Sequence, residues 1–133
     1  MCCICGAPGL PSASWCGPCK ELAKWLAGEP TNLAPKAQFD GIPALVASGD
    51  VYWVAVVFED AVGNAADPAE AVAWAEAFPN PEVAVVADND HQMYDYVYPG
   101  GFPSILVLEE DMTVRAYDRF DYDVALQSLL DGK

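Results

Sequence analysis

Two cysteines separated by two residues dominate the chemistry that this sequence could perform. Cys16 and Cys19 flank Gly17-Pro18, and the residues that follow have helical spacing. A thiol at the start of a helix lies next to unpaired backbone N–H groups and the positive end of the helix dipole, which stabilise the thiolate. The positive charge of Lys20 acts in the same direction. Because the thiolate is the attacking species in thiol–disulfide exchange, the pattern indicates a redox dithiol.

The two thiols are expected to have separate roles. Cys16, at the start of the helix, attacks a disulfide and becomes joined to the substrate. Cys19, one helical turn later, attacks this mixed disulfide and releases the product. The sequence therefore predicts Cys16 and Cys19 as the catalytic pair.

The other cysteines support a competing hypothesis. Two Cys-x2-Cys pairs with ten residues between them form a four-thiolate pattern typical of structural zinc. Its members are Cys2, Cys5, Cys16 and Cys19. Gly6 suits a zinc knuckle, and Cys3 has no role in either scheme. A zinc ion would consume both active thiols and abolish exchange. An inert thiol pair, in a redox-inert binding module, is the third alternative.

Hydrophobic patterning predicts the elements that must position these thiols. Leu22, Trp25 and Leu26 recur at helical spacing, and Gly28 followed by Pro30 ends that helix. The apolar run at residues 51–58 is rich in β-branched and aromatic residues, as in a strand buried on both faces. Further expected elements are a helix at 67–78, a strand at 83–87, a short helix at 88–97, a hairpin of 105–108 with 114–117, and a closing helix that begins at 121 or 123.

The order of these elements predicts an α/β fold. Strands that alternate with helices imply right-handed crossovers and a sheet whose faces are mostly covered. The length of 133 residues is typical of one domain, spanning 1–133. Residues 1–14 are rich in Gly, Pro and Ser, and we expect an irregular N-terminal segment there.

A known family shares the dithiol segment. Residues 12–22, SASWCGPCKEL, closely resemble the active-site motif of thioredoxins and their bacterial redoxin relatives. The strand at 51–58 that runs into Glu59-Asp60, the strand at 83–88, and Gly101-Phe102-Pro103-Ser104 before a hairpin are similar to the same family. The resemblance implies a thioredoxin-like fold, with a mixed β-sheet flanked by helices, and a protein disulfide oxidoreductase.

The resemblance also implies a substrate groove. In this family the proline that corresponds to Pro103 is cis and faces the dithiol, and the backbone of the residue before it pairs with a bound substrate strand. The substrate-binding residues would be Trp15, Gly17, Pro18, Phe102 and Pro103. A carboxylate beneath the dithiol often carries a proton, which makes Glu59 and Asp60 candidates for a relay; a solvated strand end is the alternative.

Two departures from the family pattern affect these expectations. Relatives have a buried strand directly before the active-site tryptophan, whereas residues 6–11, GAPGLP, cannot form a central strand. Either residues 2–5 supply a short strand followed by a long loop, or the start of the chain is altered. The peroxidase branch has a threonine three residues before the reactive cysteine, and Ala13 stands there instead, which disfavours peroxidase activity.

The net charge of the chain limits the classes of partner that it could bind. Twenty acidic residues against six basic ones give a formal net charge of −14, which disfavours nucleic acid and anionic lipid. No apolar run approaches the length of a membrane span. We expect a monomer that acts on protein disulfides or dithiols, receives electrons from a partner reductase and needs no bound cofactor, with zinc as the alternative. The Gly-Pro spacer resembles reducing members. The start lacks a secretory signal pattern, which favours the cytoplasm, with export as the alternative if the start is incomplete.

Overall fold

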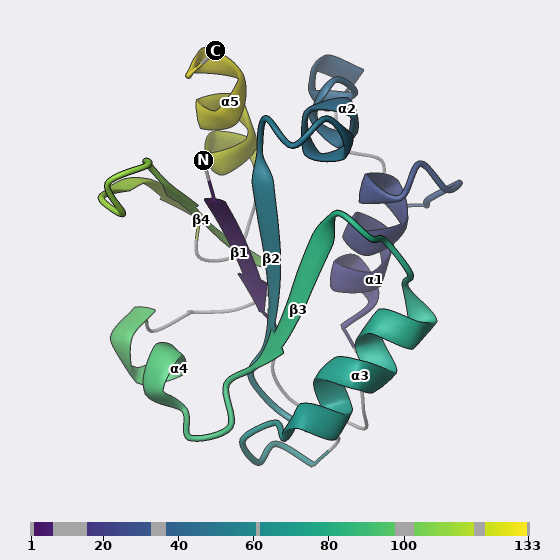
Figure 1. The fold of residues 1–133 in the computed structure, drawn as a ribbon, viewed down its shortest axis with the longest axis vertical. Coiled ribbons are helices and arrows are strands. Elements are labelled where there is room, and N and C mark those ends of the chain that lie inside the picture. The colour runs from purple at the N-terminus through teal and green to yellow at the C-terminus, as the bar shows by residue number, and fades with distance from the viewer. Residues whose placement is uncertain are drawn as a thin grey trace.

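The fold is that of a computed structural model, which describes residues 16–32, 37–60, 62–97, 103–118 and 122–132, and the backbone of residues 2–6. The elements in chain order are β1 (Cys2–Gly6), α1 (Gly17–Leu26), the short 3-10 helix η2 (Ala37–Phe39), α2 (Ile42–Ala47), β2 (Tyr52–Val57), α3 (Pro68–Ala77), β3 (Val83–Ala87), α4 (Gln92–Val97), β4 (Ser104–Leu108), β5 (Val114–Asp118) and α5 (Asp123–Asp131) (Figure 1). This confirms the predicted alternation of helices and strands.

The described strands form one mixed sheet in the order β3-β2-β1-β4-β5. β1 and β3 pair in parallel with β2, whereas β4 runs antiparallel to β1 and to β5. The parallel strands β1, β2 and β3 therefore end at the same edge of the sheet. Figure 1 shows this edge at the lower side of the molecule, where α1 begins and where α4 lies.

The prediction of an irregular start is wrong for residues 2–6, which form β1. This strand lies in the middle of the sheet, with Cys3 paired to Trp53 of β2 on one side and to Val107 of β4 on the other. Neighbouring backbones on both sides satisfy its hydrogen bonds, which stabilises a strand too short to show a pattern of its own. Of the two alternatives for the start, the structure therefore has the short strand; residues 7–14 lie outside the described part.

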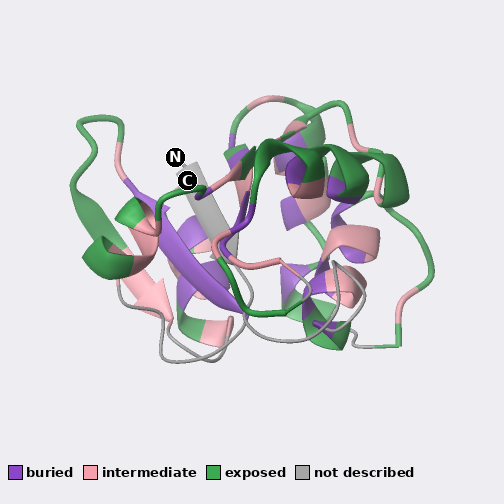
Figure 2. Ribbon diagram, turned by 90° about the horizontal axis from the view of Figure 1, so that it is seen from below, coloured by how far each residue is buried: buried purple, intermediate pink, exposed green. Residues whose placement is uncertain are grey.

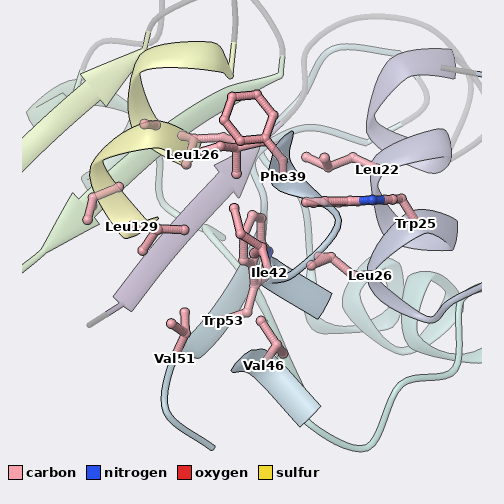
Figure 3. Packing of buried hydrophobic residues seen from close by; sticks show 13 residues of the cluster. Leu22, Trp25, Leu26, Phe39, Ile42, Val46, Val51, Trp53, Leu126 and Leu129 are labelled. Atoms are coloured by element: carbon pink, nitrogen blue, oxygen red, sulfur yellow. The ribbon is translucent and has the colours of Figure 1, made fainter. Parts of the chain in front are cut away.

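One face of the sheet is covered by α1, η2, α2 and α5. Apolar side chains from these helices meet Trp53 of β2 and Ile105 and Val107 of β4 in a continuous core (Figure 3). Its largest fully buried members are Phe39, Ile42, Val46, Val51, Ile105, Val107, Leu126 and Leu129. β4 is buried along its whole length because it is a central strand with helices over it (Figure 2). This face holds the main hydrophobic core.

α3 packs on β3 and β2 on the same face as α1, whereas α4 lies over the opposite face (Figure 1). As the sequence predicts, Asp67 caps α3: its carboxylate accepts hydrogen bonds from the backbone N–H groups of Ala69 and Glu70, and Pro68 occupies the first turn. Trp74 of α3 is buried against β2. None of the helices in the described ranges is long and apolar enough to cross a membrane.

Candidate functional site

The two cysteines of the motif form a disulfide at the start of α1. Cys16 is the N-cap residue, and its Sγ accepts a hydrogen bond from the backbone N–H of Cys19 at 3.2 Å. The Cα atoms of the bonded pair are 5.2 Å apart. Pro18 fits the first turn because its missing N–H would have no partner there. The predicted placement of the thiols at the beginning of a helix is confirmed.

The disulfide belongs to a second cluster of buried apolar residues, next to the edge of the sheet at which the parallel strands end. Cys16 and Cys19 are each only 4% exposed. We call the other buried residues of the hydrophobic cluster that contains the disulfide the sulfur cluster; they are Val56, Val57, Phe58, Ala66 and Trp74. The first three come from the last residues of β2 and the position after it. The site therefore lies where the parallel strands end, beside the beginning of α1.

Access to the disulfide is offered by the first turn of α1. Gly17 and Pro18 are exposed although the cysteines on either side of them are buried. A Cβ atom placed on Gly17 would meet nothing within 4 Å, so the space next to Gly17 is open. Both residues were predicted to contact substrate, and their exposure is compatible with that role.

The other predicted groove residues lie at the same edge or outside the described residues. Pro103 is buried and immediately precedes β4. The first residue of β4, Ser104, pairs with Gly6, the last residue of β1. Pro103 therefore reaches the carboxyl edge at which the disulfide sits. Trp15 and Phe102 are outside the described residues.

The carboxylate of Asp60 holds the turn that follows it, which disfavours a role in proton transfer. Its carboxylate accepts hydrogen bonds from the backbone N–H of Val62 at 2.9 Å and from the backbone and side-chain N–H groups of Asn64 at 2.8 and 3.1 Å. These bonds, that from Val62 foremost, lower the pKa of Asp60. A proton carrier needs a pKa near the working pH. Glu59 pairs its backbone with Ala65. Of the two alternatives for Asp60, the structure thus favours a solvated residue at the end of a strand over a proton carrier.

A carboxylate in the middle of α1, which the sequence analysis did not single out, holds the segment that follows this helix. Glu21 accepts hydrogen bonds from Lys24 Nζ at 2.8 Å, Thr31 Oγ1 at 2.8 Å and the backbone N–H of Asn32 at 2.6 Å. These bonds, that from Lys24 foremost, lower the pKa of Glu21 to about 2. Glu21 therefore ties the segment after α1 back onto the helix that carries the disulfide.

The low pKa of Glu21 predicts that the folded state loses stability in acid. Because the pKa of Glu21 falls from 4.5 to about 2 on folding, its ionised form stabilises the fold above pH 4.5, and this contribution disappears as the pH falls toward 2. Glu21→Gln should lower the free energy of unfolding at neutral pH and make its decline below pH 4.5 shallower. Part of the decline should remain, because hydrogen bonds led by Val62 and Thr113 also lower the pKa values of Asp60 and Asp111.

Urea unfolding of both proteins from neutral pH to about pH 2 measures this difference. Parallel curves for the wild type and Glu21→Gln would show that the carboxylate does not contribute through its charge.

Asp88 acts as a helix cap, as its place before the expected helix at 88–97 suggests. Asp88, which is 8% exposed, caps α4 by accepting hydrogen bonds from the backbone N–H groups of Met93 and Tyr94. The ring of Tyr94 meets that of Phe58 in the sulfur cluster edge-on, with 5.8 Å between ring centroids. The run Asp88-Asn89-Asp90 signals a helix start in the sequence, but not the neighbour on which the helix would pack.

The described side chains do not form the set of metal ligands that the zinc hypothesis requires. No three residues of the types His, Cys, Asp and Glu come together there in a way that could hold a metal ion. Cys16 and Cys19 bond to each other instead. Cys2 and Cys5 are described for their backbone alone, which is extended and paired with β2 and β4.

Comparison with known proteins gave no relatives. No family model, curated protein or solved structure matches the chain. The fold and the site together therefore define a mixed α/β protein with a buried disulfide at the first turn of a helix.

Proposed function

We propose that this protein is a thiol–disulfide oxidoreductase with a thioredoxin-like fold, whose working group is the pair Cys16 and Cys19. The observation that carries the proposal is the bond between these two thiols at the N-terminus of α1. A mixed sheet with helices on both faces, and Pro103 at the edge where the disulfide lies, agree with the resemblance of the motif.

The reaction follows from the reduced form of the pair. The Cys16 thiolate attacks one sulfur of a substrate disulfide, and the other substrate sulfur leaves as a thiolate that takes a proton from water. The Cys19 thiolate then attacks Cys16 Sγ and expels the second substrate sulfur. Two electrons pass from the dithiol to the substrate, and the Cys16–Cys19 disulfide of this structure is the oxidised product. A partner dithiol reductase returns the electrons.

The N-terminus of α1 supports the first step. The Cys19 N–H already points at Cys16 Sγ, with 3.2 Å between nitrogen and sulfur, and it would stabilise a negative charge on that atom. The positive end of the helix dipole acts in the same direction. Both effects favour Cys16 over Cys19 as the attacking thiolate, because they are strongest at the N-cap position.

The spacer between the two cysteines suggests the direction in which electrons flow. The Gly17-Pro18 spacer resembles that of reducing members of the family, so we propose reduction of protein disulfides as the physiological direction. Substrates would approach over the exposed first turn of α1 and be held next to Pro103.

The zinc alternative has less support. A zinc knuckle folds Cys-x2-Cys as a turn, so that both thiolates reach one ion, whereas residues 2–6 form an extended strand in register with both neighbours. The binding-module alternative predicts thiols that react chemically without turnover, and an activity assay separates it from the oxidoreductase.

Three measurements on the full chain test the proposal together: zinc content, titration of thiols after reduction, and acceleration of insulin reduction by a chemical dithiol. We expect no stoichiometric zinc, reactive Cys16 and Cys19, and catalytic turnover. A Cys2→Ser/Cys5→Ser double variant serves as the comparison. Loss of zinc and gain of reactivity in this variant would establish the metal site, and reactive thiols without turnover would establish the binding module.

A further inference from the structure

The outer side of β3 is an open edge of the sheet. β3 lies at one end of the sheet, at the front in Figure 1, and none of the described strands pairs with its outer side. The backbone N–H of Asp88 donates to the carbonyl oxygen of Val57 in β2 at 2.9 Å. Because successive residues of a strand turn their backbone groups to opposite sides, every second residue before Asp88 also bonds to β2. The N–H and carbonyl groups of Val85 and Ala87 therefore point outward, where another strand could pair with them.

The two edges of the sheet differ in how they resist such pairing. β5, at the other end, contains the charged residue Arg115, and its pairing with β4 is irregular between Val107 and Leu108. Charged residues and bulges are devices that keep an edge strand from joining foreign strands. β3 has neither: its sequence, VAVVA, is uncharged, and its pairing with β2 runs without interruption from Val83 to Ala87. The edge of β3 is therefore suited to accept a further strand.

The sheet face beside this edge, opposite α1 and α3, is apolar and exposed. Ala84 and Val86 of β3 and Tyr52 of β2 are exposed there, the last by 70%. α4 lies over the part of this face toward β5, because the hydroxyl of Tyr117 in β5 donates to the carbonyl oxygen of Val97 at the end of α4, at 3.0 Å. Side chains of a strand added next to β3 would therefore find apolar neighbours on this face without displacing a helix.

The charge around β3 is of one sign. The segment at 62–97, which holds α3, β3 and α4, contains seven acidic residues and no lysine or arginine. The acidic residues are Asp67, Glu70, Glu76, Glu82, Asp88, Asp90 and Asp95. Glu82 directly precedes β3 and Asp90 follows it, and both are exposed. Two copies of the chain paired at this edge would bring like charges together, which destabilises a sheet, whereas a basic strand would meet opposite charges at both ends.

We propose that the outer edge of β3 is a docking site for an extended, basic segment of another protein. The segment adds a strand to the sheet: its backbone bonds to Val85 and Ala87, and its Lys or Arg side chains lie near Glu82 and Asp90. In this mode of recognition the main-chain hydrogen bonds supply affinity, and the flanking charges select the partner. The docking site uses neither Cys16 nor Cys19, so it does not depend on the proposed redox function.

The probe is a synthetic peptide with capped ends, KVTVTVK, in which Val and Thr favour a strand and the lysines match the acidic ends of the edge. Its binding to the full-length chain is measured by calorimetric titration and by amide hydrogen exchange. At saturation, exchange at Val85 and Ala87 should slow about tenfold, whereas Ala84 and Val86, whose backbones already bond to β2, should change little. The peptide EVTVTVE, which differs only in the sign of its charges, should bind about tenfold more weakly.

Two variants of the chain test the edge itself. Glu82→Lys reverses one flanking charge and should weaken the binding of KVTVTVK about fivefold. Glu110→Lys is the matched control: it changes the net charge equally, but Glu110 lies exposed in the turn between β4 and β5, at the other end of the sheet, and affinity should change by less than about twofold. Ala87→Pro removes an outward N–H, keeps the bonds to β2, and should weaken binding about fivefold.

Three results would overturn the docking site for a basic segment. The first is the absence of KVTVTVK binding, or equally strong binding of EVTVTVE. The second is an equal effect of Glu82→Lys and Glu110→Lys, because binding would then follow net charge alone. The third is protection of the Val85 and Ala87 amides that rises with protein concentration in the absence of peptide, together with dimers in sedimentation, which would assign the edge to a second copy of the chain.

Discussion

Replacing Cys16 with serine is expected to abolish the turnover of protein disulfides. The attacking group is a thiolate, and a serine hydroxyl stays protonated at neutral pH even at the start of α1. The fold should survive, because the substitution exchanges one atom at the N-cap position and serine is itself a favoured N-cap residue. Insulin reduction should therefore fall to the uncatalysed rate while far-ultraviolet circular dichroism stays unchanged.

Cys19→Ser provides the matched comparison, since it removes the resolving thiol and keeps the attacking one. This variant should form a mixed disulfide with a substrate and then stop, so a covalent complex should accumulate on a non-reducing gel. Accumulation with Cys16→Ser instead would reverse the assigned roles. Undiminished turnover in Cys16→Ser would end the proposal for this pair.

Truncation of Phe39 should strongly destabilise the fold. Its ring is fully buried, and η2 directs it between α1, α5 and the sheet, close to Leu22 and Leu126 (Figure 3). Phe39→Ala removes this contact area and leaves a cavity, which costs about 3–5 kcal/mol. This is a large part of the 5–15 kcal/mol typical of a whole domain. Urea unfolding at neutral pH measures the loss.

Tyr96→Ala is the control for removal of an aromatic ring. Tyr96 lies on α4 and is 88% exposed, so its truncation should change the free energy of unfolding by less than about 0.5 kcal/mol. Equal losses in the two variants would show that η2 does not hold Phe39 in the core in solution.

Local signals predicted most of the elements. The apolar run that contains β2 has a composition that favours a strand, and Asp67 with Pro68 marks the start of α3 at the correct residue. No local pattern predicted β1, since five residues rich in cysteine show neither a helical nor an alternating pattern; only the family resemblance offered a short strand there, as one of two alternatives. Its stability comes from partners far along the chain, such as Trp53 and Val107, and no local pattern records them.

The candidate site, too, was only partly predictable from the sequence. The spacing of Cys16 and Cys19 predicted their place at the start of a helix, because the relevant effects act within one turn. Away from the site, the link from Tyr117 to Val97 could not be predicted, since it depends on how β5 lies relative to α4. The low pKa of Glu21 was missed for the same reason: it requires the chain to turn back and bring Thr31 next to the helix.

The central place of β1 has a consequence for how the chain assembles. The strand is synthesised before both of its neighbours, and one of them, β4, is made only after β2, α3, β3 and α4. Until then the strand presents an open edge rich in cysteine and apolar residues, which is a site for pairing with other nascent chains. Such distant partners also slow folding. The newly made chain should therefore depend on protection of β1 until β4 is synthesised.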